Sequence, residues 1–517
     1  MANKQLFKAS VGRLPPETHA RNEAGGKAYA LSPPAALAQY AATGCLNTTF
    51  YANAALQLDT VLRLCAAVEP AFVAKTAVYA RQQGQMKDMP ALLTAWLAQH
   101  SPEWLEPTFA RVIDTGRMLR NFVQILRSGA VGRKSLGSRP KRLVQSWLNG
   151  STDGQLLSAS VGNDPSLADV LKMVHPKPAN PERAAFYAWL IGKPHDAALL
   201  PEAIKALERF RDDVEAPVPD VPFQLLTALP LRPQHWVAIA CQAPWQMTRM
   251  NLNTFARHEV FKVGGMAQRI AERLRDPAAV RRARVFPYQL LSAYSMTGAS
   301  VPERVRDALQ DALEVSLENV PTLLGPVYVL LDVSGSMASP VTGHRKGATS
   351  SVRCVDVAAL VAAAISAKNP ETEILPFDTQ VHAHRLNRRD SVLTNAQTLA
   401  KFGGGGTDCG LPLGLLNHRG ATGDLVIYVS DNESWADPQR GRGTETMRQW
   451  EQFRARNPQA RLVCIDIQPY ETTQAQTRDD VLNVGGFSDT VFEVLARFAA
   501  GQLSGEHWVR EIEAVEV

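Results

Sequence analysis

Cysteine is scarce in this sequence and is not spaced for a metal centre or a redox pair. The 517 residues include six cysteines, with no Cys-x-x-Cys pair, at positions 45, 65, 241, 354, 409 and 464. This spacing argues against zinc ribbons and against a disulfide framework, and it favours a reducing compartment. We therefore expect a cytoplasmic protein.

Long hydrophobic runs are also missing. No run approaches the length that spans a bilayer, and residues 1–10 carry no apolar core for export. Hydrophobic residues make up 45% and charged residues 20% of the chain, as in an ordinary globular protein. We expect no membrane partner, and the length predicts two or more domains.

Several catalytic signatures are incomplete. The four glycines at 403–406 lack the Lys-Ser/Thr ending of a nucleotide-binding P-loop, and the residues around Gly335 do not form a G-x-S-x-G nucleophile elbow. His258-Glu259 begins like a zinc protease motif, but Lys262 stands in place of the second histidine. An aspartate-nucleophile phosphatase would carry a second aspartate where Ser334 stands. We therefore predict a protein that is not an enzyme.

Acidic residues are under-represented in the first part of the chain. Residues 1–320 hold 37 Lys and Arg against 27 Asp and Glu, whereas residues 321–517 hold 18 against 23. A basic N-terminal part and an acidic C-terminal part indicate a polyanion partner for the first part.

The first part of the chain shows helical periodicity. Its apolar stretches are short and amphipathic, so each must stack on neighbours to bury its apolar side, as in helical-pair repeats. The predicted helices cover residues 56–68, 71–83, 91–98, 108–127, 184–190, 203–210 and 305–317.

From residue 326 onward, strands and helices alternate. This alternation predicts a doubly wound, mostly parallel sheet with helices on both faces. The predicted strands are 326–331, 373–377, 381–385, 424–430 and 461–466, and the predicted helices are 352–367, 391–400, 408–416, 445–456 and 489–500. We place a helical repeat domain at 15–320 and an α/β domain at 321–517.

Oxygen-bearing side chains follow the predicted strands of the α/β domain. Asp332, Ser334 and Ser336 follow one buried strand, Thr407 follows the glycine run, and Asp431 follows another strand. The carboxyl ends of parallel strands share one edge of the sheet, so these five hard donors could meet around Mg²⁺ or Ca²⁺ rather than zinc. The alternative is that they are ordinary caps of strands and helices.

This set resembles the metal-ion-dependent adhesion site (MIDAS) of von Willebrand factor A domains. The resemblance covers residues 321–500 and implies Ser334, Ser336 and Thr407 as direct ligands, with Asp332 and Asp431 binding directly or through water. The expected cofactor is a divalent cation, Mg²⁺ first, with Ca²⁺ or Mn²⁺ as alternatives. Because Mg²⁺ keeps exchangeable waters, a partner's carboxylate or phosphate could complete the site.

Basic residues are densest between positions 111 and 142. Only one acid, Asp114, accompanies Arg111, Arg117, Arg120, Arg127, Arg133, Lys134, Arg139, Lys141 and Arg142. Arg117, Arg120 and Arg127 fall on one side of a predicted helix, and residues 132–142 are predicted to form a basic loop. Such a group suits phosphates, whereas the alternative is a solvated helix face.

Two smaller basic groups lie further along the chain. In the first, His175 stands between Lys172 and Lys177 and could stack on an unpaired base or donate to phosphate. The second is formed by Arg257, His258 and Lys262. We include both groups with the 111–142 cluster as candidate nucleic-acid contacts.

Three segments resemble the TROVE module of the Ro ribonucleoprotein family and its bacterial relatives. They are residues 22–26, residues 79–81 with 86–93, and residues 171–178, and they precede the complete adhesion-site set. The resemblance spans residues 15–510 and implies a ring of HEAT-like helical repeats followed by a von Willebrand A domain. Residues 143–170 depart from the animal pattern because they lack Lys and Arg.

The resemblance implies a function. Family members hold small structured Y RNAs and admit the 3′ ends of misfolded or immature RNAs, and bacterial relatives act alongside exonucleases. We therefore expect a non-catalytic RNA-binding protein in RNA quality control, maturation or decay, with an exoribonuclease as a further partner and a monomeric state. The rival hypotheses are a metal-dependent protein–protein adaptor without RNA, and a phosphoesterase that uses His344, His382 or His384.

Overall fold

The chain forms two compact units. The computed structural model describes residues 12–44, 46–318, 320–344, 352–387, 389–438, 441–486 and 489–517. The first unit contains the residues up to Phe72, Val285–Ser292 and Leu313–Glu516, and the second contains Val73–Arg284 and Ala293–Ala312. The helices α17 (Pro287–Met296) and α18 (Glu303–Ser316) run across the division.

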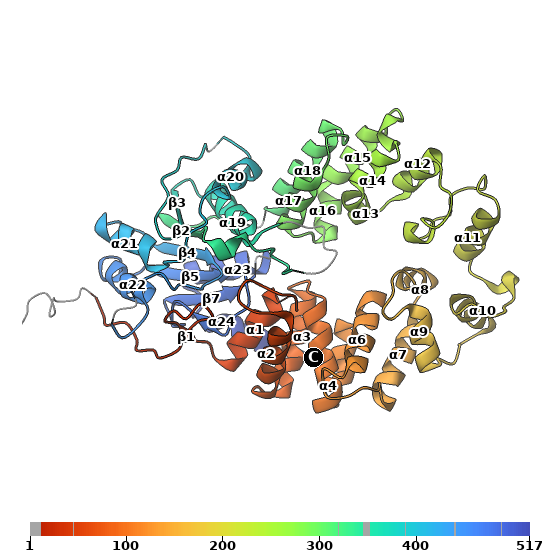
Figure 1. Cartoon of the computed structure of the whole chain (residues 1–517), viewed down its shortest axis with the longest axis horizontal. Coiled ribbons are helices and arrows are strands. Elements are labelled where there is room, and N and C mark those ends of the chain that lie inside the picture. Colours follow the sequence, from red (N-terminus) through yellow and green to blue (C-terminus); the bar gives the residue numbers. More distant parts are fainter. Residues whose placement is uncertain are drawn as a thin grey trace, which may run out of the picture. The chain divides into compact units, whose positions relative to one another are not determined.

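The first unit is built on a five-stranded parallel sheet (Figure 1). The strand order is β3-β2-β4-β5-β7, with all neighbours parallel. The strands are rich in Val, Ile and Leu and are buried on both faces, as expected for a parallel sheet covered by helices. Their bounds are β2 Val327–Asp332, β3 Thr372–Phe377, β4 Leu425–Ser430, β5 Arg461–Asp466 and β7 Val481–Gly485.

Helices cover both faces of this sheet. On one face, α19 contacts β2, β3 and β4, and α23 contacts β5 and β7. On the other face, α21 and α22 pack together over the hydrophobic cluster described below. The bounds are α19 Cys354–Lys368, α20 Val392–Leu399, α21 Gly410–His418, α22 Glu445–Arg456, α23 Asp489–Ala499 and α24 His507–Glu513, with a 3₁₀ turn, η4, at Gly335–Ala338.

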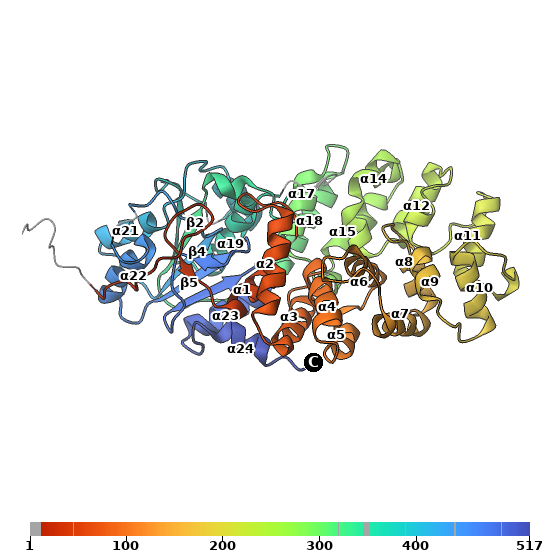
Figure 2. The ribbon, with the colours of Figure 1, turned by 60° about the horizontal axis from the view of Figure 1, so that its bottom comes forward.

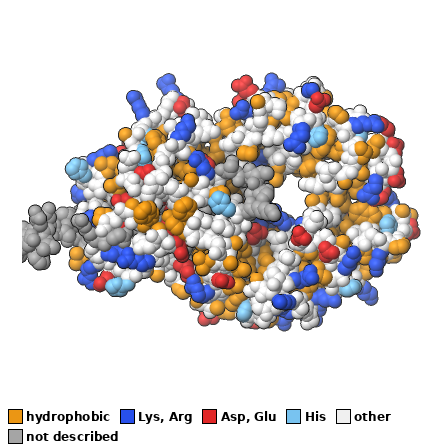
Figure 3. Space-filling view, in the orientation of Figure 1, with side chains coloured by type: hydrophobic (Ala, Val, Ile, Leu, Met, Phe, Trp, Pro, Cys, Tyr) orange, Lys and Arg blue, Asp and Glu red, His pale blue; other side chains and the backbone are white. Residues whose placement is uncertain are grey.

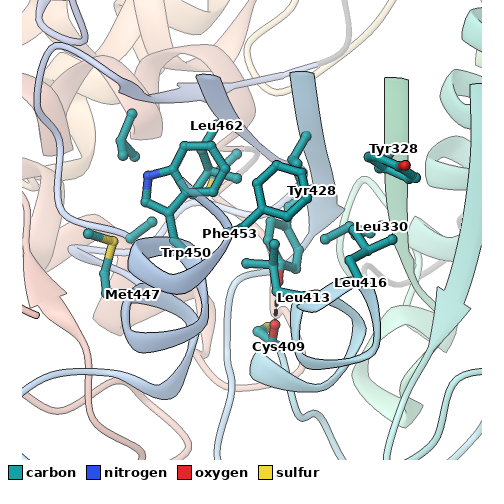
Figure 4. Close-up of a cluster of buried hydrophobic side chains, with 14 of the residues drawn as sticks. Tyr328, Leu330, Cys409, Leu413, Leu416, Tyr428, Met447, Trp450, Phe453 and Leu462 are labelled. Atoms are coloured by element: carbon teal, nitrogen blue, oxygen red, sulfur yellow. Dashed lines mark hydrogen bonds between the residues drawn. The ribbon is translucent and has the colours of Figure 1, made fainter. Parts of the chain in front are cut away.

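A cluster of large side chains fills the space beneath α21 and α22 (Figure 4). Trp450 and Phe453 of α22 are fully buried and stack at 5.8 Å between ring centroids. The Tyr428 hydroxyl donates to the backbone carbonyl of Cys409, so its polar atom is satisfied inside the core. Burial of each side chain of this size contributes about 2 kcal/mol to the stability of the fold. The cluster therefore holds in place the strands that carry the polar loops.

The N-terminal residues belong to this first unit. Strand β1 (Tyr29–Ala30) pairs antiparallel with β6 (Thr472–Thr473). Helix α1 (Pro33–Thr43) contacts β7, α24 and α2 (Ala54–Ala66), an arrangement that Figure 2 shows from a second side. The predicted division at 320/321 therefore coincides with the change from helices to strands, but not with the limits of the compact units.

The second unit consists of helices whose chain neighbours pack side by side. Helix α4 contacts α5 and α6, and α6 and α7 both contact α9. The bounds are α3 Pro70–Gln82, which begins at the division, α4 Asp88–His100, α5 Leu105–Val112, α6 Gly116–Ser128, α7 Ser138–Gly150, α8 Asp153–Ala159, α9 Leu167–Val174, α10 Pro181–Leu190, α11 Glu202–Asp212, α12 Pro233–Gln242, α13 Trp245–Met250, α14 Leu252–Arg257, α15 Met266–Arg275 and α16 Pro277–Ala283, with 3₁₀ turns η1 Ala197–Leu199, η2 Phe223–Leu225 and η3 Val260–Lys262.

The predicted fold class, helices followed by a doubly wound α/β domain, is confirmed, and two element predictions are wrong. Residues 381–385 are not a strand, because the chain turns back at Asp378 and only Val381 is bridged to Phe377 before the two segments separate. The predicted helix 108–127 is two helices, because the Thr115 side chain accepts from Met118 N and starts α6 anew.

The structure also bears on the membrane and cysteine predictions. Among the described helices, none is both long and apolar enough to cross a bilayer. The five cysteines within the described residues, at 65, 241, 354, 409 and 464, form no disulfide with one another, and Cys45 lies outside the described residues.

Candidate metal centre and nucleic-acid interface

The predicted metal ligands gather at the C-terminal edge of the sheet. Because β2 and β4 are parallel neighbours, Asp332 and Ser430 end adjacent strands. Asp332 accepts two hydrogen bonds, from the Ser334 backbone N–H at 2.8 Å and from the Ser430 hydroxyl. The Ser334 and Ser336 hydroxyl oxygens lie 3.3 Å apart. The loop after β2 therefore presents its carboxylate and two hydroxyls together.

The glycine run brings the third loop against this one. Gly335 N donates to Gly405 O at 2.9 Å, and Gly404 N donates to Val333 O at 3.0 Å. Gly403 has φ +97°, and a Cβ there would lie 1.7 Å from the Val333 carbonyl oxygen. Only glycine allows this approach, which places buried Thr407 beside the β2 loop.

Asp431 completes the set from the loop after β4. Both Asp332 and Asp431 are buried, and burial raises the pKa of each; the charge of Asp332 raises that of Asp431 further. Across the described ranges, neither carboxylate has a Lys, Arg or His ion-pair partner. Two buried, adjacent carboxylates without a cation are costly, so the five oxygen donors fit a divalent cation.

The ligand set is poor in carboxylates. No group of three or more His, Cys, Asp or Glu side chains that could hold a metal occurs among the described residues. A cation held here would therefore depend on hydroxyl donors, as the adhesion-site resemblance implies. Such a site leaves a bound cation incompletely neutralised and able to accept another anionic oxygen.

Sequence reasoning missed Tyr51 at this site. Burial and the Asp431 carboxylate raise the pKa of Tyr51, and its hydrogen bond to Ser336 opposes that shift. Tyr51 lies almost 300 residues before Ser336, in a segment expected to belong to the helical domain, so no local signal could have revealed it.

The three histidines of the phosphoesterase hypothesis have other partners. His382 Nε2 lies 3.1 Å from Asp378 Oδ1, and the other oxygen of Asp378 accepts from Gly405 N at 3.2 Å. His384 is half-buried, which lowers its pKa. His344 pairs through its backbone with Thr48. Within the described residues, none of the three histidines has a recorded contact with a predicted metal ligand.

The densest basic group divides into structural and exposed members. Arg120 donates to Val161 O at 2.7 Å, Arg133 donates to the carbonyls of Ala98 and Ser135, and Arg111 donates to Gln82 Oε1. These three guanidinium groups fix loops and helix ends. The predicted basic loop is shorter than expected, because α7 begins at Ser138 and carries Arg139, Lys141 and Arg142.

The exposed members lie on α6, α7 and α9. Helix α6 packs on α9. Hydrogen bonds from Ser166 lower the pKa of Asp169 on α9, and the positive charges of Lys172 and Arg127 lower it further. No ion pair within the described residues engages the exposed cations of these helices and their connecting loops, which are Arg117, Arg127, Lys134, Arg139, Arg142, Lys172 and Lys177. Figure 3 shows Lys and Arg side chains over the region of α7 and α9.

His175 ends α9 in an exposed, left-handed conformation with φ +47°. Gln145 of α7 donates to the carbonyls of Val174 and His175, and Asn149 donates to that of Lys177 at 2.9 Å. The turn carrying His175 and Lys177 is therefore fixed on α7, with both side chains exposed.

The third basic group is largely engaged within the protein. The His258 ring stacks on Trp236, with centroids 4.1 Å apart and an angle of 9°. Burial lowers the pKa of His258, and the Arg257 charge lowers it further. Lys262 forms an ion pair with Glu259 at 2.5 Å. Arg257 is the exposed member of this group that has no ion pair within the described residues.

Known proteins match both parts of the chain. A family model described as the Ro60 vWA domain matches residues 327–499. The "RNA-binding protein RO60" of Deinococcus radiodurans is 27% identical, over 94% of this chain and 96% of that protein. This chain is therefore similar to Ro proteins over most of its length. The "RNA-binding protein RO60" of Caenorhabditis elegans is 25% identical over 45% of this chain and 37% of its own length.

A solved structure shares the fold. The crystal structure of the Deinococcus radiodurans RO (RSR) protein matches with a TM-score of 0.61 and 24% identity, over 91% of this chain and 100% of the Deinococcus chain. The likeness therefore extends through the helices as well as the von Willebrand A domain.

Proposed function

We propose that this protein binds RNA through its helical unit, in the manner of Ro proteins. The observation that carries the proposal is the group of exposed cations on α6, α7 and α9 that have no ion pair within the described residues, in a chain similar over most of its length to a protein named for RNA binding. Unpaired cations on one set of neighbouring helices bind phosphates and release counterions.

The proposed RNA class comes from the resemblance to Ro proteins, and the chemistry of this surface suits it. Arg117, Arg127 and Lys172 would contact phosphates of a structured, Y-like small RNA, and these contacts carry no sequence information. The exposed ring of His175 would stack on an unpaired base, as in the single-stranded 3′ end of a misfolded or immature non-coding RNA. We propose a role in RNA quality control, maturation or decay.

We propose that the von Willebrand A domain binds Mg²⁺, or Ca²⁺ or Mn²⁺ in its place, through Asp332, Ser334, Ser336, Thr407 and Asp431. The cation would supply an open coordination position for an oxygen of a protein partner, and an exoribonuclease is the partner we propose. Asp332 is engaged by Ser334 and Ser430, and His382 lies against Asp378, so we assign no general base and no catalysis. We further propose that the protein acts in the cytoplasm as a monomer.

The experiment is RNA binding by the full chain at increasing salt. We expect a small RNA to copurify from the native host, and its affinity to fall by about 10³-fold or more between 50 and 200 mM salt. The RNA proposal fails if no transcript binds in dilute buffer, or if affinity barely changes with salt. Retention of a protein partner after nuclease treatment, without any RNA, would favour the adaptor hypothesis instead.

A further inference from the structure

The N-terminal segment formed by residues 18–28 lies against the loop that carries Asp431. Asn22 is only 6% exposed. Its side-chain N–H donates to the Ser434 carbonyl at 2.7 Å, and its side-chain oxygen accepts from Gly26 N at 2.7 Å. One side chain thus closes the turn of its own segment and joins that turn to a loop more than 400 residues away.

Close approach of the two backbones depends on Gly26. A Cβ at this position would lie 1.9 Å from the Ser434 carbonyl oxygen and 3.0 Å from Trp435 Cα. One residue earlier in the loop, the Glu433 carboxylate, which is fully buried, accepts from Ala24 N at 3.1 Å. The segment therefore contacts the loop at Glu433, Ser434 and Trp435.

Ser434 links this contact to a second predicted ligand. Its hydroxyl donates to the Thr407 carbonyl at 3.3 Å and accepts from Cys409 N at 3.0 Å. The backbone N–H groups of Trp435 and Ala436 both donate to the same Thr407 carbonyl at 3.0 Å. The loop that the N-terminal segment holds from one side therefore holds Thr407 on the other.

The loop itself is under conformational strain between these contacts. Asn432, next to Asp431, is a non-glycine residue with φ +66°. Its side chain is anchored on Thr473 Oγ1 at 2.9 Å and on Gln474 N at 3.1 Å. A strained turn persists only where its surroundings hold it, and Asn22 and Gly26 supply part of that surrounding structure.

We propose that Asn22 and Gly26 are positioning residues of the metal site, so that the N-terminal segment sets the affinity of the von Willebrand A domain for its divalent cation. The proposal rests on the proposed metal binding. Residues that orient metal ligands without touching the metal change affinity by about 10- to 100-fold when removed. The sequence places this segment in the helical module, yet its side-chain contacts are with the metal-site loops.

The test is titration of the full chain with Mn²⁺ alone, with free Mn²⁺ followed by electron paramagnetic resonance. Asn22→Ala and Gly26→Ala should each weaken binding by about 10-fold or more. Asn22→Asp is the second variant, because it keeps the acceptor for Gly26 N but replaces the donor to Ser434 with a carboxylate oxygen. It should weaken Mn²⁺ binding while retaining the turn of the segment.

Asn417→Ala is the matched control. Asn417, on α21, is half-buried, and like Asn22 its side chain both donates and accepts hydrogen bonds, here to Gln449 and from Arg456; none of these residues is a predicted ligand. It should bind Mn²⁺ as the unmodified chain does. Folding of each variant is checked by circular dichroism.

The outcomes separate the two proposals. If the unmodified chain binds no Mn²⁺, the proposed metal site and this inference both fail. If the unmodified chain binds Mn²⁺ and the folded Asn22→Asp and Gly26→Ala variants bind it equally well, the positioning role is overturned while the metal site stands. An equal loss in Asn417→Ala would also overturn the positioning role.

Discussion

The side-chain amide of Asn149, on α7, donates a 2.9 Å hydrogen bond to the backbone carbonyl of Lys177, in the segment that follows α9. The Tyr187 hydroxyl of α10 in turn donates to the Asn149 side-chain oxygen at 3.0 Å. The basic turn is therefore held by two helices from behind while its charged side chains face outward. Such preorganisation reduces the entropy lost when an RNA binds.

The first prediction concerns this basic surface. The triple variant Arg127→Glu, Lys172→Glu and Lys177→Glu reverses three charges of this surface. It should weaken the binding of several unrelated RNAs to a similar extent, by more than ten-fold. It should also reduce the slope of log affinity against log salt by about three, because phosphate contacts are lost without loss of base recognition. Gel-shift titrations at several salt concentrations measure both quantities.

The control reverses three charges elsewhere in the same unit, at Lys205, Arg209 and Arg211 of α11. Arg209 and Arg211 are already paired with Glu202 and Glu208. If this control weakens RNA binding as much as the first variant does, the affinity depends on net charge and not on the cations of α6, α7 and α9. Arg120 is left unchanged because it holds the Val161 carbonyl.

The second prediction concerns the proposed metal. Chelation should lower the melting temperature of the full chain, and Mg²⁺ at 100 times its Kd should restore about 2.7 kcal/mol of stability. Asp332→Ala should abolish the response to Mg²⁺, because it removes a buried carboxylate of the site. Calorimetry with and without Mg²⁺ measures the effect, and an Asp332→Ala variant that still responds would place the ion elsewhere.

The third prediction compares two neighbouring glycines of the metal-site loops. Gly403 and Gly404 both have positive φ, +97° and +111°. A Cβ at Gly404 meets nothing within 4 Å, whereas one at Gly403 meets Val333 O at 1.7 Å. Gly404→Ala should therefore lower the free energy of unfolding only by the backbone strain, about 1–3 kcal/mol. Gly403→Ala should lower it by more, because the added Cβ also meets the Val333 carbonyl. Urea denaturation measures the difference, and equal costs would contradict the close approach.

The fourth prediction concerns a buried ion pair of the first unit. Arg478 Nε lies 2.6 Å and Arg454 Nη1 lies 2.9 Å from the Asp480 carboxylate, which also accepts from Trp450 Nε1. Burial raises the pKa of Asp480, but the bonds from Arg478 and Trp450 and the arginine charges bring it below its usual value. Asp480→Asn should cost about 3 kcal/mol at neutral pH.

The pH dependence of that cost has a definite sign. A carboxyl with a lowered folded pKa contributes stability above its unfolded pKa and loses it as the pH falls through the folded pKa. The difference in the free energy of unfolding between wild type and Asp480→Asn should therefore decrease as the pH falls below about 4. Asp479→Asn, at the exposed neighbouring position, should show no such gap, and a constant gap for Asp480→Asn would contradict the prediction.

Much of the sheet, and the gathering of the candidate metal ligands at its edge, could be predicted because each rests on a local pattern. The strands β2, β4 and β5 are continuous apolar runs that end in polar residues, and parallel topology brings Asp332 and Asp431 to one edge. The strand β7 was missed because Val481–Gly485 is short and interrupted by Asn483, whose amide is satisfied by Ala475 and Thr477 inside the fold. Residues 381–385 alternate like a strand but separate from the edge of the sheet.

The contacts of the N-terminal segment could not be predicted, for a different physical reason. Nothing in residues 22–26 indicates that the Asn22 side-chain amide and the Ala24 backbone N–H find their acceptors at Ser434 and Glu433, because such pairing appears only in the folded chain. The same holds for Arg120 and Arg133, whose charge predicted a solvent-exposed role but whose guanidinium groups bind backbone carbonyls. Composition locates cations, but hydrogen bonding decides which remain available to a ligand.

The pairing of β1 with β6 has a consequence for synthesis of the chain. The first unit is discontinuous, since Tyr29 finds its partner Thr473 only after the entire helical unit has been translated. The helical unit is in effect an insertion within the α/β unit. During synthesis, β1 therefore stays unpaired until β6 has left the ribosome. A nascent chain that stops at residue 320 contains β1 but lacks the strand with which it pairs.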